Sequence, residues 1–211
     1  MTDETATEER LALALKALSV LRHDLRNLLA SVTIMAGRME ASGDERLATA
    51  APLLVGSMER TVALGVRAGQ LASAEAGAPA LTPISRALSL IEGANEVEAD
   101  GADAVVLADE GHLKVMLAEV IANAREAGGR VWLTAERVGD RVAIRVRDDG
   151  PGVPDYAQAD LFTPFKGAKR RDGTGLGLPL AARLAAFNGG ALAMEETGEA
   201  GSVFTLTLPA G

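Results

Sequence analysis

The stretch Asp148-Asp149-Gly150-Pro151-Gly152 opens the segment that decides the fold, and Gly173-Thr174-Gly175-Leu176-Gly177 closes it. Glycine lets the main chain approach a ligand closely. The first turn follows an apolar alternation typical of a strand. The second precedes an apolar run typical of a helix, whose first backbone N–H groups favour phosphate. The pair therefore predicts a nucleotide cradle, in which the carboxylate of Asp148 can accept a hydrogen bond from an exocyclic amine.

Either turn alone would be weak evidence, because a lone glycine-rich loop is often a simple tight turn. The pattern is not a P-loop, since no Gly-x-x-x-x-Gly-Lys-Ser/Thr occurs in the chain. The ordered pair resembles the ATP-binding domain shared by histidine kinases, DNA gyrase, the Hsp90 chaperones and MutL. In that family the residue that matches Asp148 binds adenine, and the segment between the two turns forms a mobile lid.

Composition narrows the remaining classes of protein. The chain has 211 residues, which suggests one or two domains, and its formal net charge of -8 argues against nucleic acid or an anionic membrane as the main partner. It has no cysteine, so it has no disulfide or cysteine metal site. The acidic N-terminus does not fit a signal peptide, and no uncharged apolar run approaches the roughly 18 residues of a membrane span. These features predict a cytoplasmic protein without membrane insertion.

The N-terminal third of the chain predicts a helical hairpin. Residues 1–8 are expected to be a disordered leader and residues 9–76 two long helices that meet near Gly43. Apolar side chains of the first helix follow alternating steps of three and four, an a/d seam typical of a coiled coil or bundle. Its members are Leu11, Ala14, Leu18, Leu21, Leu25, Leu28, Val32, Met35 and Met39. We expect two copies of the hairpin to form a dimeric four-helix bundle. The alternative is that the hairpin packs on its own C-terminal domain.

Beyond the hairpin, the periodicity of the sequence changes. Residues 77–80 are small and helix-breaking, and they are expected to be a linker. Residues 81–211 mix short alternating runs, typical of strands, with helical runs, which predicts an α/β two-layer sandwich. The expected fold is therefore multidomain, with an α hairpin followed by an α+β domain that binds ATP.

His23 is the candidate nucleophile. With Leu18 at an a position, His23 falls at f, the outward face of the bundle. A neutral imidazole is a good nucleophile near neutral pH, and the neighbouring Asp24 can orient the ring or accept its proton. Asn27 lies one turn further on the same face. A solvated surface histidine is the simple alternative, but an acid beside it and a nucleotide cradle downstream favour catalysis.

The resemblance now extends over nearly the whole chain, which looks like the catalytic half of a sensor histidine kinase. His23-Asp24-Leu25-Arg26-Asn27 resembles the phosphoacceptor box, and Glu119 to Ala124 resembles the box whose asparagine, here Asn123, binds Mg²⁺. An amide oxygen is a suitable hard ligand for Mg²⁺, and Glu119 can support it one turn earlier. The resemblance and the basic run at Lys166 give the expected ATP ligands: Asn123, Asp148, Gly150, Gly152, Phe162, Phe165, Lys166, Gly173, Thr174, Gly175, Leu176 and Gly177.

The resemblance implies a kinase that uses ATP and Mg²⁺ to phosphorylate His23 and then transfers the phosphoryl group to an aspartate of a response-regulator receiver domain. Catalysis involves His23, Asp24 and Asn27, and Asn27 also suggests a phosphatase activity toward that receiver. The chain shows no sensor segment, so a separate sensor or regulatory protein is expected to supply the signal. Two alternatives remain: a histidine phosphotransfer protein with a vestigial ATP domain, and a serine kinase with the same ATP fold.

Overall fold

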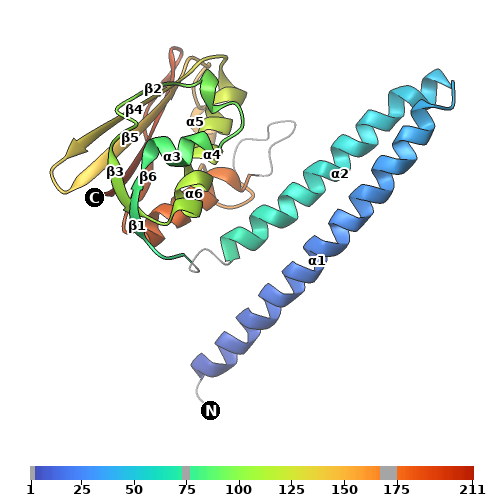
Figure 1. Cartoon of the computed structure of the whole chain (residues 1–211), viewed down its shortest axis with the longest axis horizontal. Helices are drawn as coiled ribbons and strands as arrows, with labels where there is room; N and C mark the ends of the chain where they lie inside the picture. Colours follow the sequence, from blue (N-terminus) through green and yellow to red (C-terminus); the bar gives the residue numbers. More distant parts are fainter. Residues whose placement is uncertain (1–2, 73–76, 167–174) are drawn as a thin grey trace. The chain divides into compact units, whose positions relative to one another are not determined.

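The computed structural model describes residues 3–72, 77–166 and 175–211 (Figure 1). The chain divides into two compact units, Met1–Ser73 and Ala74–Gly211. The first is the expected helical hairpin and the second the expected α/β sandwich.

The hairpin consists of α1 (Asp3–Glu40) and α2 (Glu45–Ala72). Helix α1 already begins at Asp3, within the segment 1–8 expected to be a disordered leader, because that segment holds neither proline nor glycine to interrupt a helix. At the turn, Gly43 adopts a φ of 78°, which glycine reaches without strain. The carboxylate of Asp44 accepts a hydrogen bond from the N–H of Arg46 at 2.9 Å and so caps α2.

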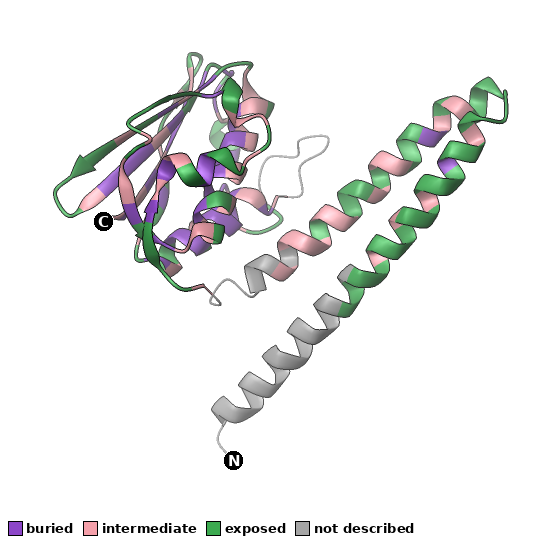
Figure 2. Cartoon of the chain, in the orientation of Figure 1, coloured by how far each residue is buried: buried purple, intermediate pink, exposed green. Residues whose placement is uncertain are grey.

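The apolar seam of α1 divides into two lines with different surroundings. The a-type residues Leu25, Val32 and Met39 are half-buried against α2, where Leu25 packs closely beside Gly65. The d-type residues Leu21, Leu28 and Met35 remain exposed, at 51%, 52% and 65% (Figure 2). The a-type line therefore packs within the hairpin, whereas the d-type line lies on the surface of the hairpin. None of the described helices has the length and apolar character that a bilayer span requires.

The second unit contains a five-stranded sheet of order β2-β4-β5-β7-β6 and a two-stranded ribbon of β1 and β3. Strands β4 and β5 pair antiparallel around the turn at Gly139, as the alternating runs on either side of Gly139-Asp140 predict. The elements are β1 (Ala80–Pro83), α3 (Ile84–Ser89), the 3₁₀ turn η1 (Ala94–Glu96), β2 (Glu98–Asp100), β3 (Val105–Ala108), α4 (Glu110–Ala127), β4 (Val131–Val138), β5 (Arg141–Asp148), α5 (Asp155–Gln158), α6 (Gly177–Phe187), β6 (Ala191–Gly198) and β7 (Gly201–Pro209).

Helices α4 and α6 cover one face of this sheet (Figures 1 and 2). Alternate residues of β5, Ile144 and Val146, are buried on the covered face, while Arg145 lies on the open face and bonds Glu136 and Glu195. The period of two along a strand therefore places Asp148, at the end of β5, on the helix-covered face. The two-layer sandwich expected from the sequence is confirmed.

The expected linker 77–80 is attached to the second unit. Ala80 already pairs with Ala108 in the β1–β3 ribbon. The N–H of Ala78 donates to Asp109 Oδ2 at 3.2 Å, and the other oxygen of Asp109 caps α4 by accepting from the N–H of His112. A side chain at Gly77 would collide with the His112 ring. These contacts fix residues 77–80 to the start of α4.

Candidate functional site

Asp148 is almost fully buried, with only 1% of its surface exposed. Its Oδ1 atom accepts hydrogen bonds from the N–H of Gly150 at 2.9 Å and from the N–H of Ser202 at 3.2 Å. Its Oδ2 atom is also buried, yet it has no hydrogen-bond partner among the described residues. A buried, unpaired carboxylate oxygen is costly, so this position calls for a donor from a ligand.

The first glycine turn is closely packed around this carboxylate. A side chain at Gly150 would collide with the backbone of Ala127 at the end of α4. Gly152 adopts a φ of 77°, and a side chain there would collide with the backbone of Gly198 at the β6–β7 turn. Both positions therefore require glycine, and the turn joins the ends of α4, β5 and β6 around Asp148.

The second glycine turn is tied to the end of the lid segment. The N–H of Phe165 donates to the carbonyl of Gly175 at 3.0 Å, and both residues have a positive φ. Leu176 is fully buried, and Gly177 begins α6. The helix start is thus anchored by its own apolar residue, and the first N–H groups of a helix have no partner within the helix.

The other lid residues differ in exposure. Phe162 is half-buried, whereas Phe165 is 68% exposed. Lys166 is exposed, and its Nζ atom lies 3.7 Å from Asp160 Oδ1. Gly173 and Thr174, also expected to bind ATP, lie outside the described residues.

Helix α4 places Glu119 and Asn123 one turn apart, and both side chains are half-buried. Glu119 Oε2 lies so close to Gly177 that a side chain at this glycine would collide with it. The carboxylate therefore sits beside the start of α6. Among the described residues no group of three or more His, Cys, Asp or Glu side chains could hold a metal alone. The pair fits Mg²⁺ instead, which takes one or two protein ligands together with phosphate oxygens.

His23 lies on α1 with 75% of its side chain exposed, in agreement with the predicted outward f position. Its Nδ1 atom lies 3.3 Å from Asp24 Oδ1 and 3.2 Å from Asn27 Nδ2. Within the described part of the chain, Nε2 makes no hydrogen bond. The three residues expected to act together are thus in contact, and the far nitrogen of the ring is open to an incoming group.

The sequence does not predict the contacts of two residues that hold the ATP domain together. Ser202 supplies the second N–H to Asp148. Asn188 is buried at the end of α6, where its Oδ1 accepts from the N–H of Asp109 and its Nδ2 lies 3.2 Å from His112 Nδ1. This network joins the start of α4 to the C-terminal end of α6, at the ends of the two helices that lie away from the glycine turns.

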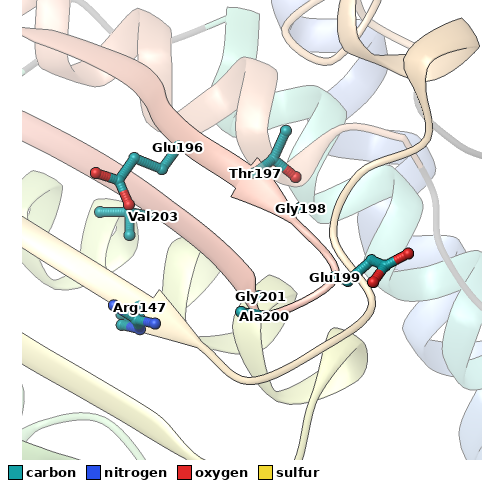
Figure 3. Close-up of a pocket in the computed structure, with 8 residues that line it drawn as sticks. All are labelled: Arg147, Glu196, Thr197, Gly198, Glu199, Ala200, Gly201 and Val203. Atoms are coloured by element: carbon teal, nitrogen blue, oxygen red, sulfur yellow. The ribbon is translucent and has the colours of Figure 1, made fainter.

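A pocket of about 450 Å³ lies at the turn between β6 and β7 (Figure 3). Arg147, Val203 and Glu196 line it from three neighbouring strands, in one cross-strand row, and residues 197–201 of the β6–β7 turn complete it. The row alternates with Asp148 and so lies on the open face of the sheet. None of the expected nucleotide ligands lines this pocket, which is therefore separate from the cradle.

A two-layer sandwich with a buried acid between two glycine turns defines an ATP-binding domain of the GHKL type, here preceded in the sequence by a helical hairpin with an exposed histidine. Residues 108–211 match the family described as "Histidine kinase-, DNA gyrase B-, and HSP90-like ATPase". The chain is 32% identical over 222 residues to the sensor protein KdpD of Mycobacterium tuberculosis, a match that covers 92% of this chain and 26% of that protein. It is 41% identical over 106 residues to the signal transduction histidine-protein kinase AfsQ2 of Streptomyces coelicolor, over 48% of this chain and 20% of AfsQ2.

The solved structures agree in fold. Full-length ShkA in complex with AMPPNP superposes with a TM-score of 0.71 at 28% identity, over 93% of this chain and 46% of that chain. The present chain thus spans about a quarter or less of the length of these two curated relatives and just under half of ShkA. The chain belongs to the histidine kinases of two-component signalling: it is a catalytic core made of a helical hairpin and the family's ATPase domain.

Proposed function

We propose that this core phosphorylates itself on His23 from ATP and passes the phosphoryl group to an aspartate of a response-regulator receiver domain. The unpaired Oδ2 atom of buried Asp148 is the observation that carries the nucleotide assignment. An exocyclic amine of adenine supplies the donor that this oxygen lacks. The complex of the similar ShkA with AMPPNP supports an ATP site in this fold.

The proposed transfer uses the open nitrogen of His23. Its Nε2 lone pair attacks the γ-phosphorus of ATP, a P–N bond forms, and the P–O bond to ADP breaks with its electron pair leaving on ADP. The ring then loses the Nδ1 proton, which Asp24 at 3.3 Å can accept. The receiver's carboxylate next attacks the phosphorus, the P–N bond breaks, and the imidazole takes up a proton. Positioning and charge neutralisation supply most of the catalysis.

Asn123 and Glu119 would hold Mg²⁺ beside the start of α6. When bound, the ion neutralises charge on the phosphate oxygens. The exposed amine of Lys166 can add a further positive charge near the polyphosphate, since its only described contact is a long one to Asp160.

The proposed assembly is a homodimer through the hairpin. The exposed residues Leu21, Leu28 and Met35 form one apolar line along α1, and α2 adds exposed Leu53 and Leu54. Two such hairpins can bury these lines in a four-helix bundle. The resulting bundle would present His23 on its outer surface, where a receiver domain can approach it.

The test is incubation of the purified chain with γ-labelled ATP and Mg²⁺. Label that is stable to base and labile to acid, present in wild type and absent from His23→Gln, is the expected result. Asp148→Asn should take less label than wild type at limiting ATP, because its affinity for ATP is lower. Wild type that binds ATP yet takes no label would favour the phosphotransfer alternative, and acid-stable label would favour the serine kinase.

Asn27 favours one additional activity, removal of phosphate from the phosphorylated receiver. Its amide lies 3.2 Å from His23 on the exposed face, a position from which an amide can orient an attacking water toward the receiver's phospho-aspartate. We expect Asn27→Ala to slow loss of label from the receiver by up to about a hundredfold. Equal decay rates with wild type and variant, at matched binding to the receiver, would assign Asn27 no part in that reaction.

A further inference from the structure

The two polar neighbours of His23 meet the ring at the same nitrogen. Asp24 Oδ1 lies 3.3 Å from Nδ1, and Asn27 Nδ2 lies 3.2 Å from the same atom. A neutral imidazole carries one proton, on Nδ1 or on Nε2, and the other nitrogen is then an acceptor. An ionised carboxylate only accepts, whereas an amide nitrogen only donates. The two contacts therefore cannot both be hydrogen bonds of one neutral ring.

Each contact selects a different tautomer. The bond to Asp24 requires the proton on Nδ1, which leaves the lone pair on Nε2, the open nitrogen. The bond from Asn27 requires the lone pair on Nδ1 and so places the proton on Nε2, which then has no lone pair available to attack phosphorus. The partner of one ring nitrogen thus decides whether the other is a nucleophile.

We propose that Asn27 is a positioning residue that restrains autophosphorylation by holding His23 in the tautomer protonated on Nε2, in competition with Asp24. The proposal rests on the proposed function, because it assigns regulation to the nucleophile on His23. The contact is built into a regular helix, since residues four apart on α1 are neighbours on one face. In this role Asn27 slows the kinase reaction. This is distinct from its proposed role in the phosphatase reaction, in which it orients an attacking water.

The tautomer can be measured directly on the full chain by long-range ¹H–¹⁵N correlation with ¹⁵N-labelled histidine. The chain has two histidines, so His23→Gln identifies the signals of His23 by their loss. The pH of the measurement is one at which the same spectra show only the neutral ring. Asn27→Ala removes the donor, and Asn27→Asp replaces it with a second acceptor.

Both Asn27 variants should raise the ratio of Nδ1–H to Nε2–H tautomer by roughly two- to tenfold, the effect of one exposed hydrogen bond on an equilibrium constant. Asp24→Ala removes the competing acceptor and should lower the ratio. Ser31→Ala is the matched control, because Ser31 lies one turn beyond Asn27 and its hydroxyl donates to the backbone carbonyl of Asn27, away from the amide group. That variant should leave the ratio unchanged.

The second readout is the initial rate of His23 phosphorylation at saturating ATP. Asn27→Ala should raise it, by no more than the change in tautomer ratio. A merely structural role for Asn27 would lower the rate or leave it unchanged. An unchanged or lower ratio in both Asn27 variants overturns the proposal, as does a shifted ratio with no gain in rate. If no protein takes label, wild type included, the proposed function is contradicted instead. The tautomer ratio needs no ATP, so it still tests whether Asn27 donates to His23.

Discussion

At the scale of single residues, the two oxygens of Asp148 have different roles. Oδ1 accepts hydrogen bonds from the N–H groups of Gly150 and Ser202, whereas Oδ2 has no partner among the described residues and is the proposed acceptor for adenine. Asp148→Asn can keep the Oδ1 acceptor while it turns the other position into a donor. We therefore expect the ATP affinity to fall by roughly ten- to a hundredfold, or about 1.5–3 kcal/mol, in a titration with a fluorescent ATP analogue.

The control is Asp149→Asn, the same change at the next residue, whose Oδ1 bonds the backbone of Gly129 and Arg130 instead. Its ATP affinity should not fall. Folding of both variants is followed by the fluorescence of Trp132, the one tryptophan, which lies in the ATP domain. An Asp148→Asn protein that is folded and binds ATP normally would contradict the adenine assignment.

The sequence predicts the position of Asp148, because an alternating run that ends in an acid before a glycine turn places that acid at the end of a strand. It could not predict the division between the two oxygens. That division depends on Ser202, which is 54 residues away in the chain and reaches Asp148 only after β7 pairs with β5. His112 lies in the first turn of α4, and its contact with Asn188 depends equally on long-range packing.

At the scale of elements, Asp149 connects α4 to the sheet. Its Oδ1 accepts from the N–H of Arg130 at 3.0 Å and from the N–H of Gly129 at 2.9 Å, in the loop that joins α4 to β4. The bond from Arg130 and then that from Gly129 hold the pKa of Asp149 below its ordinary value of 3.8, and outweigh partial desolvation, which raises it. The loop and the first glycine turn are thereby fastened together.

The sign of the pH dependence follows from that lowered pKa. The folded chain binds the Asp149 proton less readily than the unfolded chain, so this contribution to stability is present above about pH 4 and is lost as the pH falls through the folded pKa. Asp149→Asn keeps an acceptor but does not titrate. Thermal unfolding between about pH 5 and pH 3 should therefore show a shallower loss of Tm in Asp149→Asn than in wild type. Parallel curves would mean that the N–H groups of Gly129 and Arg130 bind an ionised carboxylate no better than an uncharged acceptor.

Elements with strong local signals were predictable, and their ends were less so. Alternating runs around a glycine turn predict the β4–β5 hairpin, and an aspartate before a helical run predicts the capping of α4 by Asp109. The structure has both, because these signals act locally. The sequence alone predicts that Thr82 caps a helix over residues 83–91. The structure places Thr82 in β1 instead, where its hydroxyl donates to the carbonyl of Ala108. That strand exists only because β3, two dozen residues later, supplies its partner, and no local pattern encodes such a pairing.

At the scale of the whole molecule, the heptad pattern predicts a seam but not which line of it faces which partner. Steps of three and four put both lines on one broad stripe of α1. The structure divides them: Leu25, Val32 and Met39 are half-buried in the hairpin, and Leu21, Leu28 and Met35 remain exposed. The difference comes from the direction from which α2 approaches, which the length and chemistry of the turn at Gly43 decide.

The exposed line predicts that the chain is a dimer that Leu28→Glu dissociates. Leu28 is 52% exposed, so a charge is tolerated on a monomer, whereas the same charge buried in a four-helix bundle would lose its hydration without a partner. Light scattering should give about twice the chain mass for wild type and the chain mass for Leu28→Glu. Val138→Glu is the control, because Val138 is similarly exposed, at 57%, but lies in the ATP domain. A dimeric Leu28→Glu protein, or a monomeric wild type with a folded hairpin, would rule out this line as the interface, and with it the bundle in which His23 is proposed to work.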